Sequence, residues 1–184
     1  VPATSYETRT RGNGLKVFSV LEKTTPNITV QVFYGVGAKD EPQGRSGFAH
    51  LFEHMMFKAT RDMPAGLMDR LTEDVGGFNN ASTYDDFTNY YTTFSKEDLE
   101  TMLEVEADRF QNLDYSLEGF KTEARAILGE YNKNSANPFA KLVKSRRESA
   151  FTTDTYRHTP MGYIQDIEDM PNQFDYSKTF FKRW

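Results

Sequence analysis

Two histidines, His50 and His54, stand four residues apart with Glu53 between them, and this spacing constrains the chain more than any other feature. An α-helix turns about 100° per residue, so a helix would project all three side chains from one face. That face would offer two imidazoles and a carboxylate. Neutral imidazoles suit zinc, and an adjacent carboxylate can take the proton of an attacking water. The motif, an inverted form of a zinc-protease signature, therefore predicts a metal-dependent hydrolytic helix.

The composition narrows the remaining possibilities. The chain has no cysteine, so disulfides and thiolate ligands are excluded and only His, Asp and Glu can hold a metal. With 184 residues, 38% of them hydrophobic and 27% charged, the chain is long enough for one globular domain with a substantial core. The formal net charge of -5 argues against nucleic acid as a partner. No apolar run approaches the roughly 20 residues of a membrane span, and no signal peptide is retained.

Periodicity and turn residues predict an α+β fold. The β-rich runs 15–21 and 28–34 are separated by turn-forming residues and are expected to pair, as are 78–83 and 87–94. Helices are expected to begin near Ser46, after Pro64, at 95–98, near Ser116 and near Asn172. The helix from Ser116 is expected to continue past an interruption at Asn137-Pro138 toward Phe151. We expect an antiparallel or mixed sheet covered by helices, with the metal helix packed against the helix that starts near Ser116.

Two histidines need a third ligand, and Glu123 and Glu130 are the best candidates. They lie seven residues apart, on nearly the same face of one predicted helix, so one could bind metal while the other supports the site. Periodicity alone leaves open the alternative of two solvated glutamates on an amphipathic helix. His158 lies in a polar segment, and an ordinary surface or packing histidine is the better interpretation.

Several linked motifs resemble the pitrilysin/insulinase-type zinc metallopeptidases, family M16, which include the mitochondrial processing peptidases. Residues 44–60 are similar to the family's metal helix and its flanks, and 76–83, followed by Tyr90-Tyr91, are similar to its substrate-strand segment. Glu130 lies 76 residues beyond His54, at the place of the family's third zinc ligand. Residues 160–162 and 181–184 also resemble late segments of the family's first domain. Together these matches are far more specific than the five-residue motif.

The resemblance implies one zinc ion held by His50, His54 and Glu130, with Glu53 as the general base that activates water. Glu123 would orient His54 or a neighbouring group. The implied activity is that of an endopeptidase acting on extended peptides or unfolded segments. These would pair with the exposed edge of strand 78–83, in which Asn80 and Ala81 are the expected contact residues. Without the zinc motif, a plain hairpin with turn-forming asparagines would be the preferred reading of that strand.

In the resembling family two homologous domains enclose the substrate, so a second domain or subunit is an expected partner. We interpret 1–184 as a single N-terminal catalytic domain, a fragment or truncated first half of a longer chain, because the last predicted helix reaches Trp184 without a terminating signal. The start at Val1 fits a removed leader. A periplasmic location is favoured over the mitochondrial matrix or the cytoplasm.

Two other functions compete with the peptidase. The first is a non-catalytic zinc-binding subunit or interaction domain of an M16-type complex, although such members commonly lose motif residues that are all present in this chain. The second is a small-molecule zinc lyase like the S-ribosylhomocysteine-cleaving enzyme, which shares the motif. That enzyme's chemistry uses a cysteine, and this chain has none.

Overall fold

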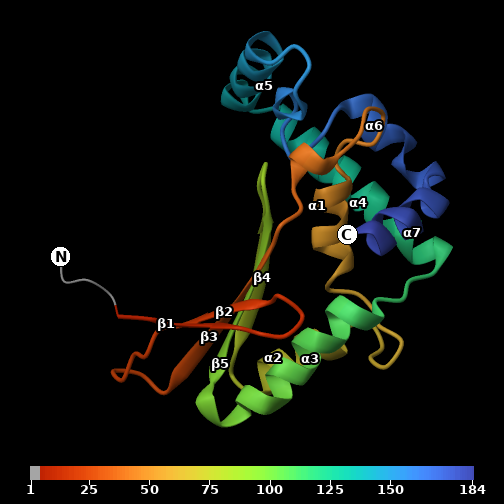
Figure 1. Ribbon diagram of the computed structural model, residues 1–184. Helices are drawn as coiled ribbons and strands as arrows, with labels where there is room; N and C mark the ends of the chain where they lie inside the picture. Colours follow the sequence, from red (N-terminus) through yellow and green to blue (C-terminus); the bar gives the residue numbers. More distant parts are fainter. Residues whose placement is uncertain (1–4) are drawn as a thin grey trace.

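The computed structural model describes residues 5–184, which form a small sheet, a separate hairpin and a group of helices (Figure 1). The strands are β1 (Glu7–Thr10), β2 (Lys16–Ser19), β3 (Asn27–Tyr34), β4 (Phe78–Thr83) and β5 (Thr88–Ser95). The helices are α1 (Phe48–Met55), α2 (Leu67–Asp74), α3 (Leu99–Asn112), α4 (Leu117–Ser135), α5 (Pro138–Ala150), α6 (Ile164–Asp169) and α7 (Phe174–Arg183). The α+β class predicted from the sequence is confirmed.

The main sheet is antiparallel and has the strand order β3-β5-β4. The central strand β5 alternates between buried and half-buried residues, which is the pattern of a strand with one face on a core. It pairs with β3 along its whole length and with β4 from Phe78↔Thr93 to Thr83↔Thr88. The predicted 78–83 and 87–94 pair is therefore confirmed, and β4 lies at an edge of this sheet.

The predicted pairing of 15–21 with 28–34 is wrong. Strand β2 pairs instead with β1, a strand that the sequence reading missed, and β3 pairs with β5. The reason lies in the Asn13-Gly14 dipeptide, a strong hairpin signal, where Gly14 has φ 87° and its N–H donates to the carbonyl of Arg11. This tight turn joins β1 to β2 locally. Strand β3 instead pairs with β5 over eight residues.

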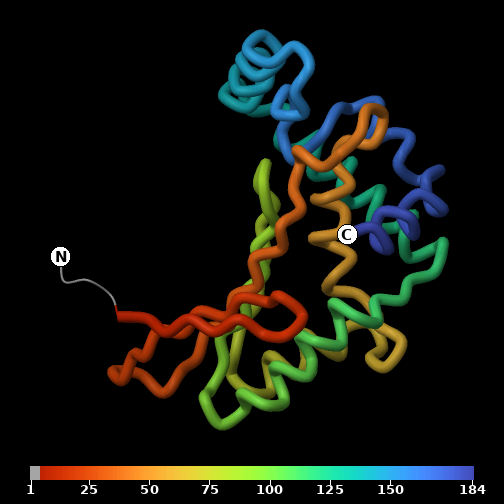
Figure 2. Tube along the Cα trace, viewed as in Figure 1, coloured from red at the N-terminus to blue at the C-terminus, as the bar shows by residue number. Residues whose placement is uncertain are grey.

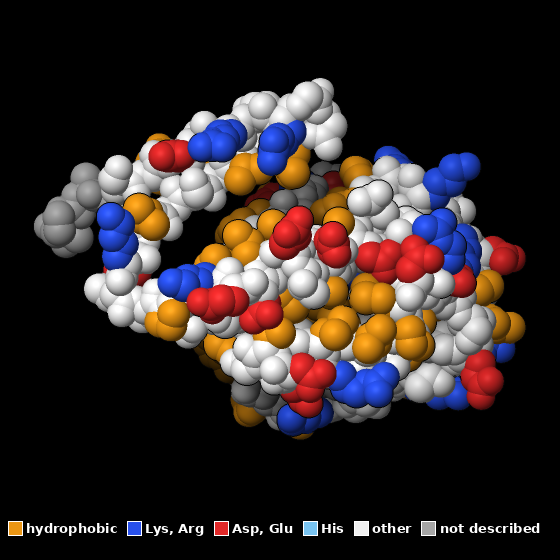
Figure 3. All heavy atoms as spheres, turned by 90° about the horizontal axis from the view of Figure 1, so that it is seen from below, with side chains coloured by type: hydrophobic (Ala, Val, Ile, Leu, Met, Phe, Trp, Pro, Cys, Tyr) orange, Lys and Arg blue, Asp and Glu red, His pale blue; other side chains and the backbone are white. Residues whose placement is uncertain are grey.

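The hairpin β1–β2 forms an arm, and its tube crosses that of the main sheet in this view (Figure 2). Seen from below, a gap separates the arm from the body of the molecule, and hydrophobic side chains lie along it (Figure 3). The large exposed apolar residues of this region are Tyr6, Leu15, Val17, Phe18, Val20 and Leu21. No helix in the described part of the chain combines the length and apolarity needed to cross a bilayer.

Helix α1 occupies the centre, between the sheet and helices α4 and α7 (Figure 1). Three of its residues, Phe48, Leu51 and Met55, are fully buried, so the helix is fixed by its apolar sides. Its N-cap is Gly47 in the left-handed conformation, not Ser46 as predicted. Ser46 instead donates its hydroxyl to Asp166 and accepts the N–H of Tyr163, so it anchors the loop before α1.

Most helix predictions are confirmed by their caps. Ser116 accepts the N–H of Gly119 at the start of α4. At the expected interruption α4 ends at Ser135, and a separate helix, α5, begins at Pro138, where Asn137 accepts the N–H of Phe139. The last helix, α7, begins within two residues of the expected Asn172. Helix α6 was not predicted, because its six residues are too few to show a period.

Candidate metal centre

Helix α1 turns its three polar motif residues to one side. His50 is buried, while Glu53 and His54 are half-buried. The opposite sides carry the apolar residues that pack the helix into the core, including Phe52, whose ring stacks on that of Phe180 at 5.1 Å between centroids. Because packing fixes the rotation of α1, the two imidazoles and the carboxylate are held in a partly dry environment. The predicted metal helix is therefore helical and buried in the expected way.

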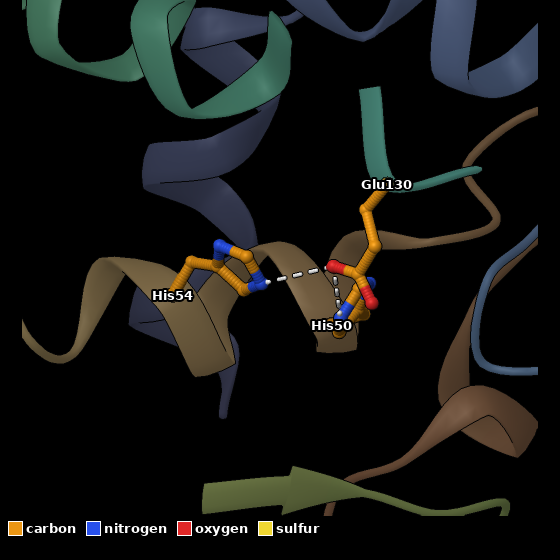
Figure 4. Close-up of side chains that lie close together, drawn as sticks. All are labelled: His50, His54 and Glu130. Carbon is orange, nitrogen blue, oxygen red and sulfur yellow. Dashed lines mark ion pairs between the residues drawn. The ribbon is translucent and has the colours of Figure 1, made fainter. Parts of the chain in front are cut away.

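The two imidazoles meet the carboxylate of Glu130, which α4 brings over from a distant part of the chain (Figure 4). The Oε2 atom of Glu130 lies 3.6 Å from Nε2 of His50 and 3.6 Å from Nε2 of His54. All three donor atoms lie within 4.8 Å of one another. The two imidazole rings stand edge to face, 4.9 Å apart between centroids. Of the two predicted third ligands, Glu130 is thus the one that converges on both histidines.

This donor set fits a zinc ion. Bonds of about 2.0–2.1 Å in a tetrahedron place neighbouring donor atoms roughly 3.3 Å apart, close to the 3.6 Å between Glu130 and each imidazole. Two nitrogens and one carboxylate oxygen also match the donors of catalytic zinc sites, which keep a position open for water or substrate. His50, His54 and Glu130 are therefore the residues that could hold the metal.

Glu123 lies on the outer side of His54 rather than at the point of convergence. Its Oε2 is 3.5 Å from Nδ1 of His54, and its Oε1 is 2.7 Å from Nζ of Lys58. The contact with Glu123 raises the pKa of His54, and the same contact lowers the pKa of Glu123. Burial, in contrast, lowers the pKa of His50 and keeps its imidazole neutral, which is the form that binds metal.

The two histidines are held in different ways. The side chain of Glu123, 13% exposed, faces Nδ1 of His54, whereas the buried Nδ1 of His50 has no hydrogen-bond partner among the described residues. His50 is oriented by the packing around it, since only 7% of its surface is exposed. Lys58 was not singled out from the sequence, because it lies beyond the end of α1 and its partner, Glu123, is on a distant helix.

Glu53 receives a hydrogen bond from the hydroxyl of Thr83, the last residue of β4. No sequence pattern pointed to Thr83, because nothing local links a strand end to a helix thirty residues earlier. The expected substrate contacts, Asn80 and Ala81, lie on the same edge strand. The N–H of Ala81 donates to the side-chain oxygen of Asn80 at 2.8 Å, so Asn80 covers a backbone donor of this edge.

A second buried network fixes the loop that leads into α1. The carboxylate of Glu41 accepts the N–H groups of Gly47 and Ala49, at 2.8 and 2.7 Å, and is 1% exposed. Burial raises the pKa of Glu41 well above its usual value. His158, itself buried, has its Nδ1 3.7 Å from Glu41 and does not join the metal cluster, so the packing interpretation of this histidine agrees with its position.

Comparisons with known proteins agree with this geometry. The family model described as Insulinase (Peptidase family M16) matches residues 16–164. Zinc protease PqqE of Helicobacter pylori is 36% identical over 166 residues, covering 89% of this chain and 37% of that protein. A probable mitochondrial-processing peptidase subunit beta of Arabidopsis thaliana is 29% identical over 182 residues, covering 95% of this chain and 34% of that protein.

A solved structure is similar throughout the chain. The crystal structure of a protease from Helicobacter pylori superposes with a TM-score of 0.91 at 33% identity, covering 97% of this chain and 43% of that one. The chain spans little more than a third of the length of these two curated relatives. Family model, relatives and superposition agree: the chain belongs to peptidase family M16, the insulinase family.

Proposed function

We propose that the protein is a zinc-dependent endopeptidase and that His50, His54 and Glu130 hold its zinc. The observation that carries the proposal is that these three donors, two from α1 and one from α4, lie within 4.8 Å of one another. Glu53 lies on the same packed helix as the two histidines. Two relatives from the comparisons support it, since one is named a zinc protease and the other a processing peptidase subunit. When bound, zinc supplies a Lewis acid that polarises the peptide carbonyl and makes water more acidic.

We propose a separate role in the reaction for each of three residues of this chain. Glu53 takes the proton of the attacking water and delivers it to the leaving amine, the general acid–base role of a positioned carboxylate. Glu123 keeps Nδ1 of His54 occupied and so presents Nε2 to the metal. Burial lowers the pKa of His50 and so favours the neutral imidazole that binds a metal.

The substrate we propose is an extended peptide or an unfolded segment. Strand β4 lies at an edge of its sheet and ends at Thr83, beside Glu53, so a peptide paired with this edge would run past the base. Asn80 and Ala81 are the proposed contact residues. For Ala81 to donate to a peptide carbonyl, the side chain of Asn80 must first turn away from its N–H.

We further propose that this region acts with a second homologous domain or subunit, and that 1–184 forms one domain of the assembly. The greater length of the relatives and the word subunit in one of their names support this. For location we propose the periplasm, since the more similar of those two relatives is bacterial. Cell fractionation distinguishes this from the mitochondrial matrix and the cytoplasm.

The test measures bound zinc together with cleavage of a mixture of quenched fluorescent peptides, with Glu53→Gln as the control. We expect about one zinc per chain in both proteins and cleavage only in the unsubstituted one. Zinc without cleavage in either protein would assign catalysis to the assembly with the second domain. Absence of both zinc and cleavage would refute the proposal in favour of a non-catalytic interaction domain.

A further inference from the structure

The general base proposed above has a partner from the sheet. The hydroxyl of Thr83 donates to Oε2 of Glu53 at 2.5 Å, across thirty residues of sequence. We infer that Thr83 is a positioning residue that fixes the carboxylate of Glu53 for proton transfer. This inference rests on the proposed function. The hydrogen bond engages Oε2, which leaves the other carboxylate oxygen to take a proton from water.

The hydroxyl of Thr83 is held in place by the turn that follows it. Thr83 pairs with Thr88 at the end of the β4–β5 ladder, and Tyr84 donates its N–H to the carbonyl of Phe87 at 2.8 Å. The turn is then tied to the segment before α1, because the carbonyl of Tyr84 accepts the N–H of Ala38 at 3.1 Å. The strand end that carries Thr83 is therefore joined to the segment that leads into α1, the helix that carries Glu53.

The close approach of these two segments depends on a glycine. A Cβ atom added to Gly37 would lie 2.5 Å from the carbonyl oxygens of both Tyr84 and Asp85, a distance that real Cβ atoms do not show. Asp85 is held in turn by a two-pronged ion pair with Arg147 of α5, at 2.7 and 2.9 Å. The backbone that carries Thr83 is thus fixed from three sides, which makes its hydroxyl a preorganised donor.

Thr83 also borders a pocket of about 370 Å³ whose walls include Tyr84, Asp85 and Arg147. The residue therefore lies where the proposed peptide-binding edge, this pocket and the general base meet. A shift of β4 on substrate binding would be transmitted to Glu53 through one hydrogen bond. This arrangement predicts that Thr83 affects turnover more than substrate affinity.

The experiment compares Thr83→Val, which removes the hydroxyl at similar shape, with Thr83→Ser, which keeps it. Thr29→Val is the matched control, because Thr29 shares a hydroxyl hydrogen bond with Thr93 elsewhere in the sheet. We expect kcat of Thr83→Val to fall about tenfold or more, with KM changed by less than about twofold, since hydrogen bonds to charged groups are among the stronger ones. Thr83→Ser should recover most of kcat, and every variant should retain zinc.

A readout that needs no turnover accompanies the kinetics. In a double-mutant cycle of Thr83→Val and Glu53→Ala, which removes the acceptor, urea unfolding should show non-additivity of about tenfold in the unfolding constant. Unchanged kcat in Thr83→Val, or strict additivity in the cycle, would overturn the inference and leave the proposed function intact. A chain that neither binds zinc nor cleaves peptides overturns the proposed function. If zinc binds without cleavage, the cycle alone decides on Thr83.

Discussion

Replacing Glu123 with Gln tests how the candidate metal centre is held. Glu123 faces Nδ1 of His54 at 3.5 Å and Nζ of Lys58 at 2.7 Å, and its side chain is 13% exposed. The amide of Gln keeps the size of the side chain but loses the charge that favours the Nδ1–H form of His54. Losing such a carboxylate partner typically lowers metal affinity by about 10–100-fold, which is about 1.4–2.8 kcal/mol.

The contribution of Lys58 should be much smaller. Its side chain is 41% exposed, so its ion pair with Glu123 is screened by solvent and contributes about 0–1 kcal/mol to stability. Lys58→Met also leaves the contact between Glu123 and Nδ1 of His54 in place. We therefore expect the zinc dissociation constant of Lys58→Met to change by less than about threefold, in contrast with Glu123→Gln.

The assay is competition for zinc against a chelator of known affinity, read by absorbance at neutral pH. Glu118→Gln is the matched control, because Glu118 is an exposed glutamate in the first turn of the same helix, α4. A Glu123→Gln dissociation constant within about twofold of the unsubstituted protein would refute the reasoning. So would an equal effect of Glu118→Gln, which would point to overall charge rather than to the contact with His54.

Three further predictions follow from the geometry. Gly37→Ala should lower the free energy of unfolding by about 1–3 kcal/mol in urea titrations, because its Cβ would press on the carbonyls of Tyr84 and Asp85. Burial lowers the pKa of His158, so the unfolded chain binds more protons between that pKa and about 6.5. Stability is therefore complete above that range and falls as the pH drops through it. His158→Gln should flatten this slope in unfolding curves measured from pH 7.5 to 5; an unchanged slope would assign it to other groups. Finally, chelation should lower the melting temperature, since zinc at about 100 times its dissociation constant adds about 2.7 kcal/mol; a metal-independent melting curve would contradict the site.

Local signals predicted helices better than strand pairing. The periodicity around the motif on α1 and the Ser116 cap of α4 act within a few residues, so these patterns are visible in the sequence, and both helices form where they were expected. Strand pairing depends on competition between distant segments. The predicted partner of β2 was wrong for this reason, because β2 pairs with β1. The contact between Thr83 and Glu53 likewise depends on how a strand end meets a helix, which no local pattern encodes.

The choice between Glu123 and Glu130 shows the same limit at the site itself. Their seven-residue spacing placed both on one helix face but could not say which would reach the histidines. The structure brings Glu130 to both imidazoles and leaves Glu123 between His54 and Lys58. The distinction arises from the way α4 lies against α1, a property of the packed helices rather than of either one alone.

The origin of the donors on two separate helices has a consequence for folding. An ion shared by His54 and Glu130 would join positions 76 residues apart and enclose β4, β5 and α3 in one closed loop. Such a cross-link restricts the unfolded chain and also limits partial opening of the native one. Amide hydrogen exchange in α4 would then slow when the metal binds. The exchange rates of these backbone amides would therefore show whether the metal links α1 to α4.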